Sequence, residues 1–350
     1  MQTVERSEQN QLPIFDEIDR LYGLLSVYQS PNGLPELVDK RVYPIVEKFN
    51  RYSETVWQFD YNERPVVPTT QPKGDTIVLC FSGGRDSIVS LMKYRSEGRD
   101  VILYHTHGIN ASQSDEIRAA EECARYFNVP LITNTVRYHG HNVWMEHPMK
   151  NIIIAGSALN YTLSNHLGYN IAFGNYSDSE LCGVPFHVCA GDCMDMWEAY
   201  EGALHEDLPD FKVGVNLKNL GETMDYICGN DEVLDMSISC LCRHSLRDYR
   251  RDWVQSKFGV VLPRHRCGSC GKCTAEYIYR ADHGQTPFSE AYYRYCIDNL
   301  YKVILRGEAG NWDILTVEDV FNTFLFYPVE QSRMYEQIQN ATLRSASIAW

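Results

Sequence analysis

The sequence predicts an α/β protein built on a doubly wound parallel sheet, with a small metal-binding segment and helical additions at both ends. From Asp75 onwards, four short runs rich in β-branched residues alternate with longer runs that have helical spacing. A Ser-Gly-Gly turn separates the first of these strands from the first helix. Further along, three cysteines follow one another with two residues between neighbours, which is typical of a metal site.

The expected strands are 76–81, 101–105, 130–136 and 169–173, and helices fill the intervals from about 87 to 97, 112 to 128 and 151 to 167. Alternating strands and helices form parallel sheets with a helix layer on each face. Ligands of such sheets bind outside the carboxyl ends of the strands. We therefore expect the loops at Ser82, His105 and Gly174 to converge on a ligand site.

The chain divides into four predicted segments. Residues 1–74 form a helical extension with expected helices at 14–27 and 34–49, followed by a proline-rich linker at 64–73. Residues 75–235 form the sheet domain and 236–280 the metal-binding segment. Residues 281–350 form a helical C-terminal region, with expected helices at 290–305 and 316–326.

The composition favours a cytoplasmic protein without a membrane partner. No apolar stretch reaches the length of about 18 residues that a membrane helix needs, and the N-terminus has no signal-peptide pattern. The twelve cysteines are too few for a disulfide scaffold of 350 residues and predict thiols or metal ligands. A net charge of −14 argues against general nucleic-acid binding. The arginine-rich stretch 243–266 leaves open a local basic patch or an exposed helix face.

The turn after the first strand predicts an anion site. Paired glycines permit positive φ and a close backbone approach, and the N-terminus of the following helix directs unpaired N–H groups into one space. Two serine hydroxyls add donors, and an aspartate offers a ligand for Mg²⁺ that is bound to phosphates. An ordinary glycine turn is the alternative. The residues are Ser82, Gly83, Gly84, Arg85, Asp86 and Ser87.

This turn resembles the Ser-Gly-Gly-x-Asp-Ser signature of the PP-loop ATP pyrophosphatases, and no Walker motif is present. The resemblance implies that the loop holds the β- and γ-phosphates of ATP, with Mg²⁺, as a leaving group. A substrate atom then attacks the α-phosphorus, which yields an adenylate and pyrophosphate. Ser82, Asp86, Ser87 and Lys150 are the catalytic residues that it implies.

A narrower resemblance is to the QueC-like 7-cyano-7-deazaguanine synthases, through Tyr104-His-Thr-His-Gly108, His147-Pro-Met-Lys-Asn151 and Gly174-Asn175. It implies further nucleotide contacts from His105, Lys150, Asn151, Gly174 and Asn175. Lys150 stands where the family has an arginine, which keeps the charge but loses the bidentate fork. Asp192-Cys193 falls where the family reads the deazaguanine base, although Asp192 is equally well placed to cap a helix beginning near Met194.

Four cysteines are the predicted metal ligands. Cys267, Cys270 and Cys273, with Cys240 upstream, supply four thiolates for a tetrahedral zinc ion and resemble the QueC-like zinc site. Such a site is structural because no coordination position is open. Cys242 competes with Cys240 for the fourth position, and an iron–sulfur cluster competes with zinc.

The resemblance implies an ATP-dependent ligase that adenylates 7-carboxy-7-deazaguanine and passes it to an amine. The product is an amide or 7-cyano-7-deazaguanine. The added segments are similar to those of QueC-like proteins in anti-phage defence operons, and this similarity implies two candidate amines, ammonia or an amine of a partner protein encoded nearby. The family also suggests a homodimer. A tRNA-modifying thiolase, with Cys182, Cys189 or Cys193 as the reactive thiol, and a non-catalytic nucleotide-binding regulator are the alternatives.

Overall fold

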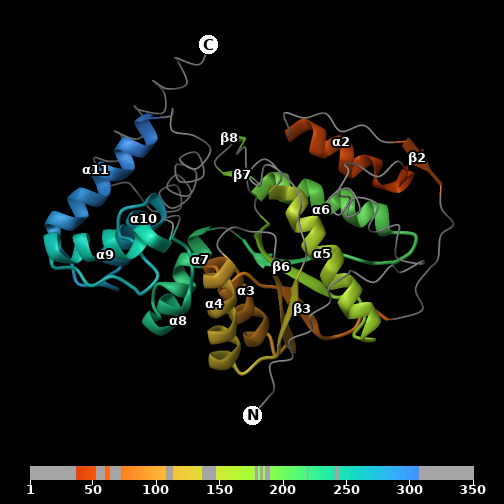
Figure 1. The fold of residues 1–350 in the computed structure, drawn as a ribbon, viewed down its shortest axis with the longest axis horizontal. Helices are drawn as coiled ribbons and strands as arrows, with labels where there is room; N and C mark the ends of the chain where they lie inside the picture. Colours follow the sequence, from red (N-terminus) through yellow and green to blue (C-terminus); the bar gives the residue numbers. More distant parts are fainter. Residues whose placement is uncertain are drawn as a thin grey trace. The chain divides into compact units, whose positions relative to one another are not determined.

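The computed structural model describes residues 37–52, 60–63, 72–107, 113–135, 147–177, 180–181, 184–185, 190–218, 220–240 and 244–306. The chain forms two compact units (Figure 1). The first comprises residues 1–83, 90–179 and 189–216, and the second comprises 84–89, 180–188 and 217–350. Within the described residues, no helix combines the length and the apolar composition needed to cross a membrane.

The first unit is built on a five-stranded sheet in the order β5-β4-β3-β6-β9. The strands are β3 (Ile77–Cys80), β4 (Val101–His107), β5 (Leu131–Thr135), β6 (Ile171–Tyr176) and β9 (Gly214–Leu217). β3 pairs in parallel with both β4 and β6, and β4 pairs in parallel with β5. The strand order reverses at β3, so the carboxyl ends of β3 and β6 flank the topological switch point at which such sheets bind ligands.

Helices cover both faces of this sheet (Figure 1). α5 (His147–Ser164) and α6 (Ala190–Leu204) pack on the face to which Val78, Cys80 and Tyr104 point. α4 (Gln113–Phe127) and the end of α3 (Arg85–Ser96) belong to the opposite face. All four residues of β3 are buried, as expected for a central strand covered on both sides. The predicted α/β fold with a parallel sheet is therefore confirmed.

A polar network ties α5 to the sheet. The Tyr104 hydroxyl lies 2.7 Å from Ser157 Oγ, and Asn134 Nδ2 donates to the same oxygen at 2.6 Å. All three side chains are buried. Burial raises the pKa of Tyr104, so the phenol stays protonated. Because buried polar groups are stable only when they are hydrogen-bonded, this network fixes the position of α5 over β4 and β5.

The structure differs from the sequence prediction at the starts of several elements. The expected helix 34–49 is wrong in its first part, where β1 (Leu37–Asp39) and a 3₁₀ turn (Lys40–Val42) precede α2 (Tyr43–Tyr52). β1 pairs with β2 (Asp60–Asn62), a contact between distant residues that local spacing does not reveal. The expected helices 14–27 and 316–326, and most of the linker 64–73, lie outside the described residues.

The second unit is largely helical. Its elements are the short hairpin β7 (Glu180–Leu181) and β8 (Val184–Pro185), followed by α7 (Leu220–Ile227), α8 (Asp231–Met236), α9 (His244–Phe258), α10 (Gly271–Asp282) and α11 (Glu290–Arg306). Aromatic side chains make up much of its core. Phe258 of α9, Tyr277 of α10 and Tyr292 of α11 pack with ring centroids 4.4 to 5.3 Å apart. These contacts join the three helices into one cluster.

The second unit also contains a buried ion pair. Arg266 is 1% exposed, and its Nε and Nη2 atoms donate to Glu276 at 2.7 and 2.9 Å. Its Nη1 and Nη2 also donate to the carbonyl and hydroxyl oxygens of Ser237. Burial disfavours the charged guanidinium, but the pairing with Glu276 outweighs this and raises the pKa of Arg266. The cation is thus fully paired inside the unit.

Replacing Glu276 with glutamine will destabilise the protein because it leaves the Arg266 charge buried without a counter-ion. We expect the free energy of unfolding to fall by about 3 kcal/mol, measured by urea denaturation. The matched control is Glu290→Gln, which breaks an exposed pair with Arg294. That change should cost less than about 0.5 kcal/mol. Equal effects of the two variants would contradict a structural role for the buried pair.

Candidate nucleotide loop and metal centre

The predicted phosphate loop connects the central strand β3 to α3. β3 ends at Cys80 and α3 begins at Arg85, two residues before the expected start. Gly83 has φ +75°, and a Cβ atom there would lie 2.6 Å from the Ala119 Cβ of α4. Only glycine satisfies both the positive φ and this close approach. The conformation of this turn therefore requires glycine at position 83.

The functional groups of the loop differ in their availability. Ser82 is exposed, and the Asp86 side chain is 34% exposed. Ser87 is buried, and its hydroxyl donates to the Gly84 carbonyl at 2.9 Å. In this conformation the Ser87 hydrogen is already used, so Ser87 offers an oxygen lone pair rather than a donor. Asp86 and Ser82 are therefore the loop side chains with the largest exposure to solvent.

Arg85 belongs to the loop motif, but its side chain is buried rather than exposed to a ligand. Its side chain is buried, with Nη1 3.2 Å from the Met224 sulfur and Nε 3.5 Å from Asp86 Oδ1. Its backbone N–H, the first of α3, donates to Ser239 Oγ at 3.2 Å. Arg85 therefore anchors the start of the helix inside the second unit and brings a positive charge beside Asp86.

His105 lies under the loop rather than on the surface. It is 1% exposed, and Nδ1 lies 2.9 Å from the carbonyl oxygen of Phe81, the residue before Ser82. Nδ1 must carry the proton to make this bond, which leaves Nε2 as an acceptor without a partner among the described residues. Burial lowers the pKa of His105, so the ring is neutral. The geometry makes His105 a support for the loop backbone.

The other predicted nucleotide contacts lie in β6 and at the start of α5. Gly174 and Asn175 are half-buried and fall within β6, which continues three residues past its expected end. Asn151 is half-buried in α5, which begins at His147 and so includes the predicted loop motif in its first turn. The side chain of Lys150 lies outside the described residues.

The predicted base-reading pair Asp192-Cys193 lies in the first turn of α6. That helix begins at Ala190, four residues before the expected start near Met194. Asp192 is therefore inside the helix and not at its cap, so the capping alternative is wrong in its position. The side chains of both residues lie outside the described part of the chain.

Gly83 and Gly98 have similar positive φ angles, so alanine substitutions at the two positions separate the effect of packing from the effect of backbone conformation. Gly83→Ala adds a positive-φ penalty and a collision with Ala119, whereas Gly98→Ala, with φ +73° and no neighbour within 4 Å, adds only the first. We expect Gly98→Ala to lower the free energy of unfolding by about 1 kcal/mol and Gly83→Ala by about 3 kcal/mol. Thermal denaturation of both variants checks this, and equal losses would disprove the tight packing at Gly83.

The four predicted cysteines form the second site. The sulfur atoms of Cys240, Cys267, Cys270 and Cys273 all lie within 4.8 Å of one another, close enough to hold a metal ion. Three of the sulfur–sulfur distances are 3.9, 3.9 and 3.4 Å, for Cys240–Cys270, Cys267–Cys273 and Cys270–Cys273. A tetrahedral zinc ion with bonds of about 2.3 Å places its sulfurs about 3.8 Å apart. The donor set is thus compatible with zinc, and the distances are far too long for a disulfide.

Local contacts prepare Cys267 to be a thiolate ligand. The neighbouring thiols of Cys240, Cys270 and Cys273 lower the pKa of Cys267, and the hydrogen bond from the Ser269 backbone N–H adds to the effect. The N–H groups of Ser269 and Cys270 lie 3.4 and 3.2 Å from the Cys267 sulfur. Gly268, between Cys267 and Ser269, has φ +70°, the conformation that turns these amides toward the sulfur. Cys242, the other candidate ligand, lies outside the described residues.

Metal analysis tests this centre directly. We expect about one zinc ion per purified chain, and Cys267→Ser should remove it because one of four ligands is lost. The matched control is Cys296→Ser, a buried cysteine that does not belong to the cluster. Elemental mass spectrometry of both variants gives the answer. Iron with acid-labile sulfide in place of zinc would establish the iron–sulfur alternative.

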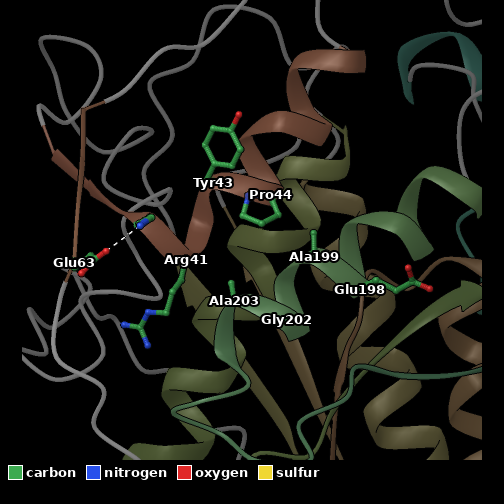
Figure 2. Close-up of a pocket in the computed structure, with 9 residues that line it drawn as sticks. Arg41, Tyr43, Pro44, Glu63, Glu198, Ala199, Gly202 and Ala203 are labelled. Carbon is green, nitrogen blue, oxygen red and sulfur yellow. Dashed lines mark hydrogen bonds and ion pairs between the residues drawn. The ribbon is translucent and has the colours of Figure 1, made fainter.

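A separate pocket of about 860 Å³ lies between α2 and α6 of the first unit (Figure 2). Ala199, Gly202 and Ala203 of α6 line one side, while Tyr43 and Pro44 of α2 line another. Three of its four charged lining residues are paired, because Lys40 contacts Glu63 at 2.9 Å and Arg41 is held by Asp39 and Asp207. None of the predicted site residues lines it. The pocket therefore gives no support to the predicted chemistry.

No protein-family model matches the chain, and no curated protein is significantly similar to it in sequence.

Sequence reasoning missed two residues that support these sites. No sequence pattern singles out Ser239, whose hydroxyl lies at the start of α3 in the structure. Arg266 falls within the arginine-rich stretch 243–266, but it is buried and paired. The position of each next to a predicted metal ligand, Cys240 and Cys267, was the signal available in the sequence.

Proposed function

We propose that the chain is an ATP-dependent ligase of the QueC-like kind. It adenylates the carboxylate of 7-carboxy-7-deazaguanine and transfers the acyl group to an amine, giving an amide or, after dehydration, 7-cyano-7-deazaguanine. The observation that carries this proposal is the position of the Ser82–Ser87 motif. It follows the central strand at the point where the strand order reverses, which is where nucleotides bind in sheets of this kind.

The loop supplies the groups that departing pyrophosphate requires. The N-terminus of α3 presents backbone N–H groups and a positive dipole end to the β- and γ-phosphates. Ser82 adds an exposed hydroxyl, and Asp86 is the residue that would hold Mg²⁺. The cation supplies charge neutralisation for the developing pyrophosphate. Lys150 is the proposed contact for the phosphate under attack.

The reaction balances without a redox partner. A carboxylate oxygen of the substrate attacks the α-phosphorus, and the bond between this phosphorus and the bridging oxygen breaks to release pyrophosphate. The amine then attacks the carbonyl carbon of the adenylate, loses a proton and expels AMP. Positioning and electrostatic stabilisation account for the rate, because the loop forms no covalent bond with the substrate.

The acceptor amine is ammonia or an amine of a partner protein. The segments before residue 75 and after residue 280 are the proposed docking surface for a protein acceptor. In this proposal Asp192 accepts hydrogen bonds from the guanine-like edge of the base, which carries adjacent N–H donors. The four-cysteine centre has a structural role, since a zinc ion with four thiolates has no position left for a substrate.

The proposal is tested by incubating the protein with ATP, Mg²⁺, 7-carboxy-7-deazaguanine and ammonium and analysing the products by mass spectrometry. We expect AMP, pyrophosphate and an amide or nitrile product. Asp86→Asn should lower the rate of AMP formation at least a hundredfold, because the cation on the leaving group loses its ligand.

The matched control is Asp75→Asn, at the opposite end of the same strand, which should retain the wild-type rate. Formation of ADP and phosphate instead of AMP would contradict the proposed chemistry. A mass increase of a co-expressed neighbouring gene product, absent with Asp86→Asn, would identify a protein as the acceptor. Formation of a thiolated tRNA would establish the alternative enzyme.

A further inference from the structure

Ser239 is placed at the phosphate loop by the segment that carries the metal ligands. It follows α8 and precedes Cys240, yet its Oγ accepts a hydrogen bond from the backbone N–H of Arg85 at 3.2 Å. The two residues are 154 positions apart in the chain. Both lie in the second unit, so the contact is internal to that unit. The first N–H group of α3 is thereby paired with a side chain.

The Ser239 hydroxyl still has a hydrogen to donate. A serine oxygen that accepts one bond retains its own O–H group, and no described residue accepts a hydrogen bond from Ser239. Its side chain is half-buried, so it is open on one side. By contrast, the Ser87 hydrogen is used within the turn at Gly84. Ser239 therefore brings a hydroxyl donor next to the backbone groups of residues 84–87.

Neighbours on both sides hold Ser239 in place. Ser237, two residues earlier, is completely buried, and both its carbonyl and its hydroxyl oxygen accept hydrogen bonds from Arg266. Cys240, the next residue, is one of the four clustered thiols. A donor fixed in this way loses little conformational entropy when a ligand binds.

We propose that Ser239 is a phosphate-binding residue of the loop and donates its hydroxyl hydrogen to a terminal phosphate of the bound nucleotide. This inference rests on the proposed ATP-dependent function. It adds a ligand from a segment far from the Ser82–Ser87 motif. It also gives the four-cysteine centre a second effect, which is to set the position of a donor at the nucleotide. The chemistry recognised is a di- or triphosphate group, with pyrophosphate as the minimal ligand.

Isothermal titration of magnesium pyrophosphate, magnesium ATP and AMP into the full-length protein tests the assignment. Ser239→Ala should weaken binding of pyrophosphate and of ATP about tenfold, because each loses one charge-assisted hydrogen bond. AMP lacks the terminal phosphates and should bind within twofold of wild type. Ser239→Thr keeps the hydroxyl and should retain most of the affinity for pyrophosphate.

Ser96→Ala is the matched control. Ser96 is the last residue of α3, where its hydroxyl donates to the Lys93 carbonyl oxygen at 2.7 Å, and we expect unchanged pyrophosphate affinity. Metal content is measured for every variant. Unchanged pyrophosphate affinity of Ser239→Ala would overturn the proposal. Loss of its metal, or an equal loss of AMP affinity, would overturn it too by making Ser239 structural. Failure of the wild type to bind both pyrophosphate and ATP would refute the proposed function itself.

Discussion

The buried charge of Arg266 is the constraint on which the second unit depends. A guanidinium at 1% exposure is tolerated only when it is fully paired, and here Glu276 of α10 and the backbone and side chain of Ser237 supply the partners. These bonds connect the two stretches of chain that carry the cysteines. Cys240 and Cys270 are 30 positions apart, and the ion pair fixes their segments side by side independently of the thiols.

The segment that Arg266 holds in place also contacts the start of α3. Ser239 lies between the residue held by Arg266 and a clustered thiol, and it pairs with the first N–H group of the helix. Within the first unit, Gly83 leaves no space for a side chain against Ala119. Both ends of the turn are therefore held by contacts within the protein itself. Preorganised donors of this kind are effective because they need no rearrangement during binding.

A group of buried arginines contrasts with the acidic composition of the chain. The net charge is −14, but three arginines gather around the buried Cys228 thiol in the second unit. Burial and the nearby Glu276 carboxylate raise the pKa of Cys228, while Arg85, Arg280 and Arg266 act in the opposite direction. Each of these arginines has an acidic neighbour, because Arg266 pairs with Glu276, Arg280 pairs with Asp231, and Arg85 lies 3.5 Å from Asp86. The charges in this part of the second unit are therefore largely balanced.

The sequence by itself determined the parallel sheet, the glycine turn and the cysteine set, because strand periodicity, a positive-φ glycine and metal-ligand spacing are all local patterns. It missed β1 and the early starts of α5 and α6, whose limits depend on packing between distant residues. Only the tertiary structure decided which hydroxyl faces the loop. The Ser87 hydroxyl donates to the Gly84 carbonyl oxygen within the turn. Ser239 Oγ accepts a hydrogen bond from the backbone N–H of Arg85, 154 positions away in the chain. A hydrogen bond between residues so far apart depends on how the intervening chain folds, so no local pattern in the sequence encodes it.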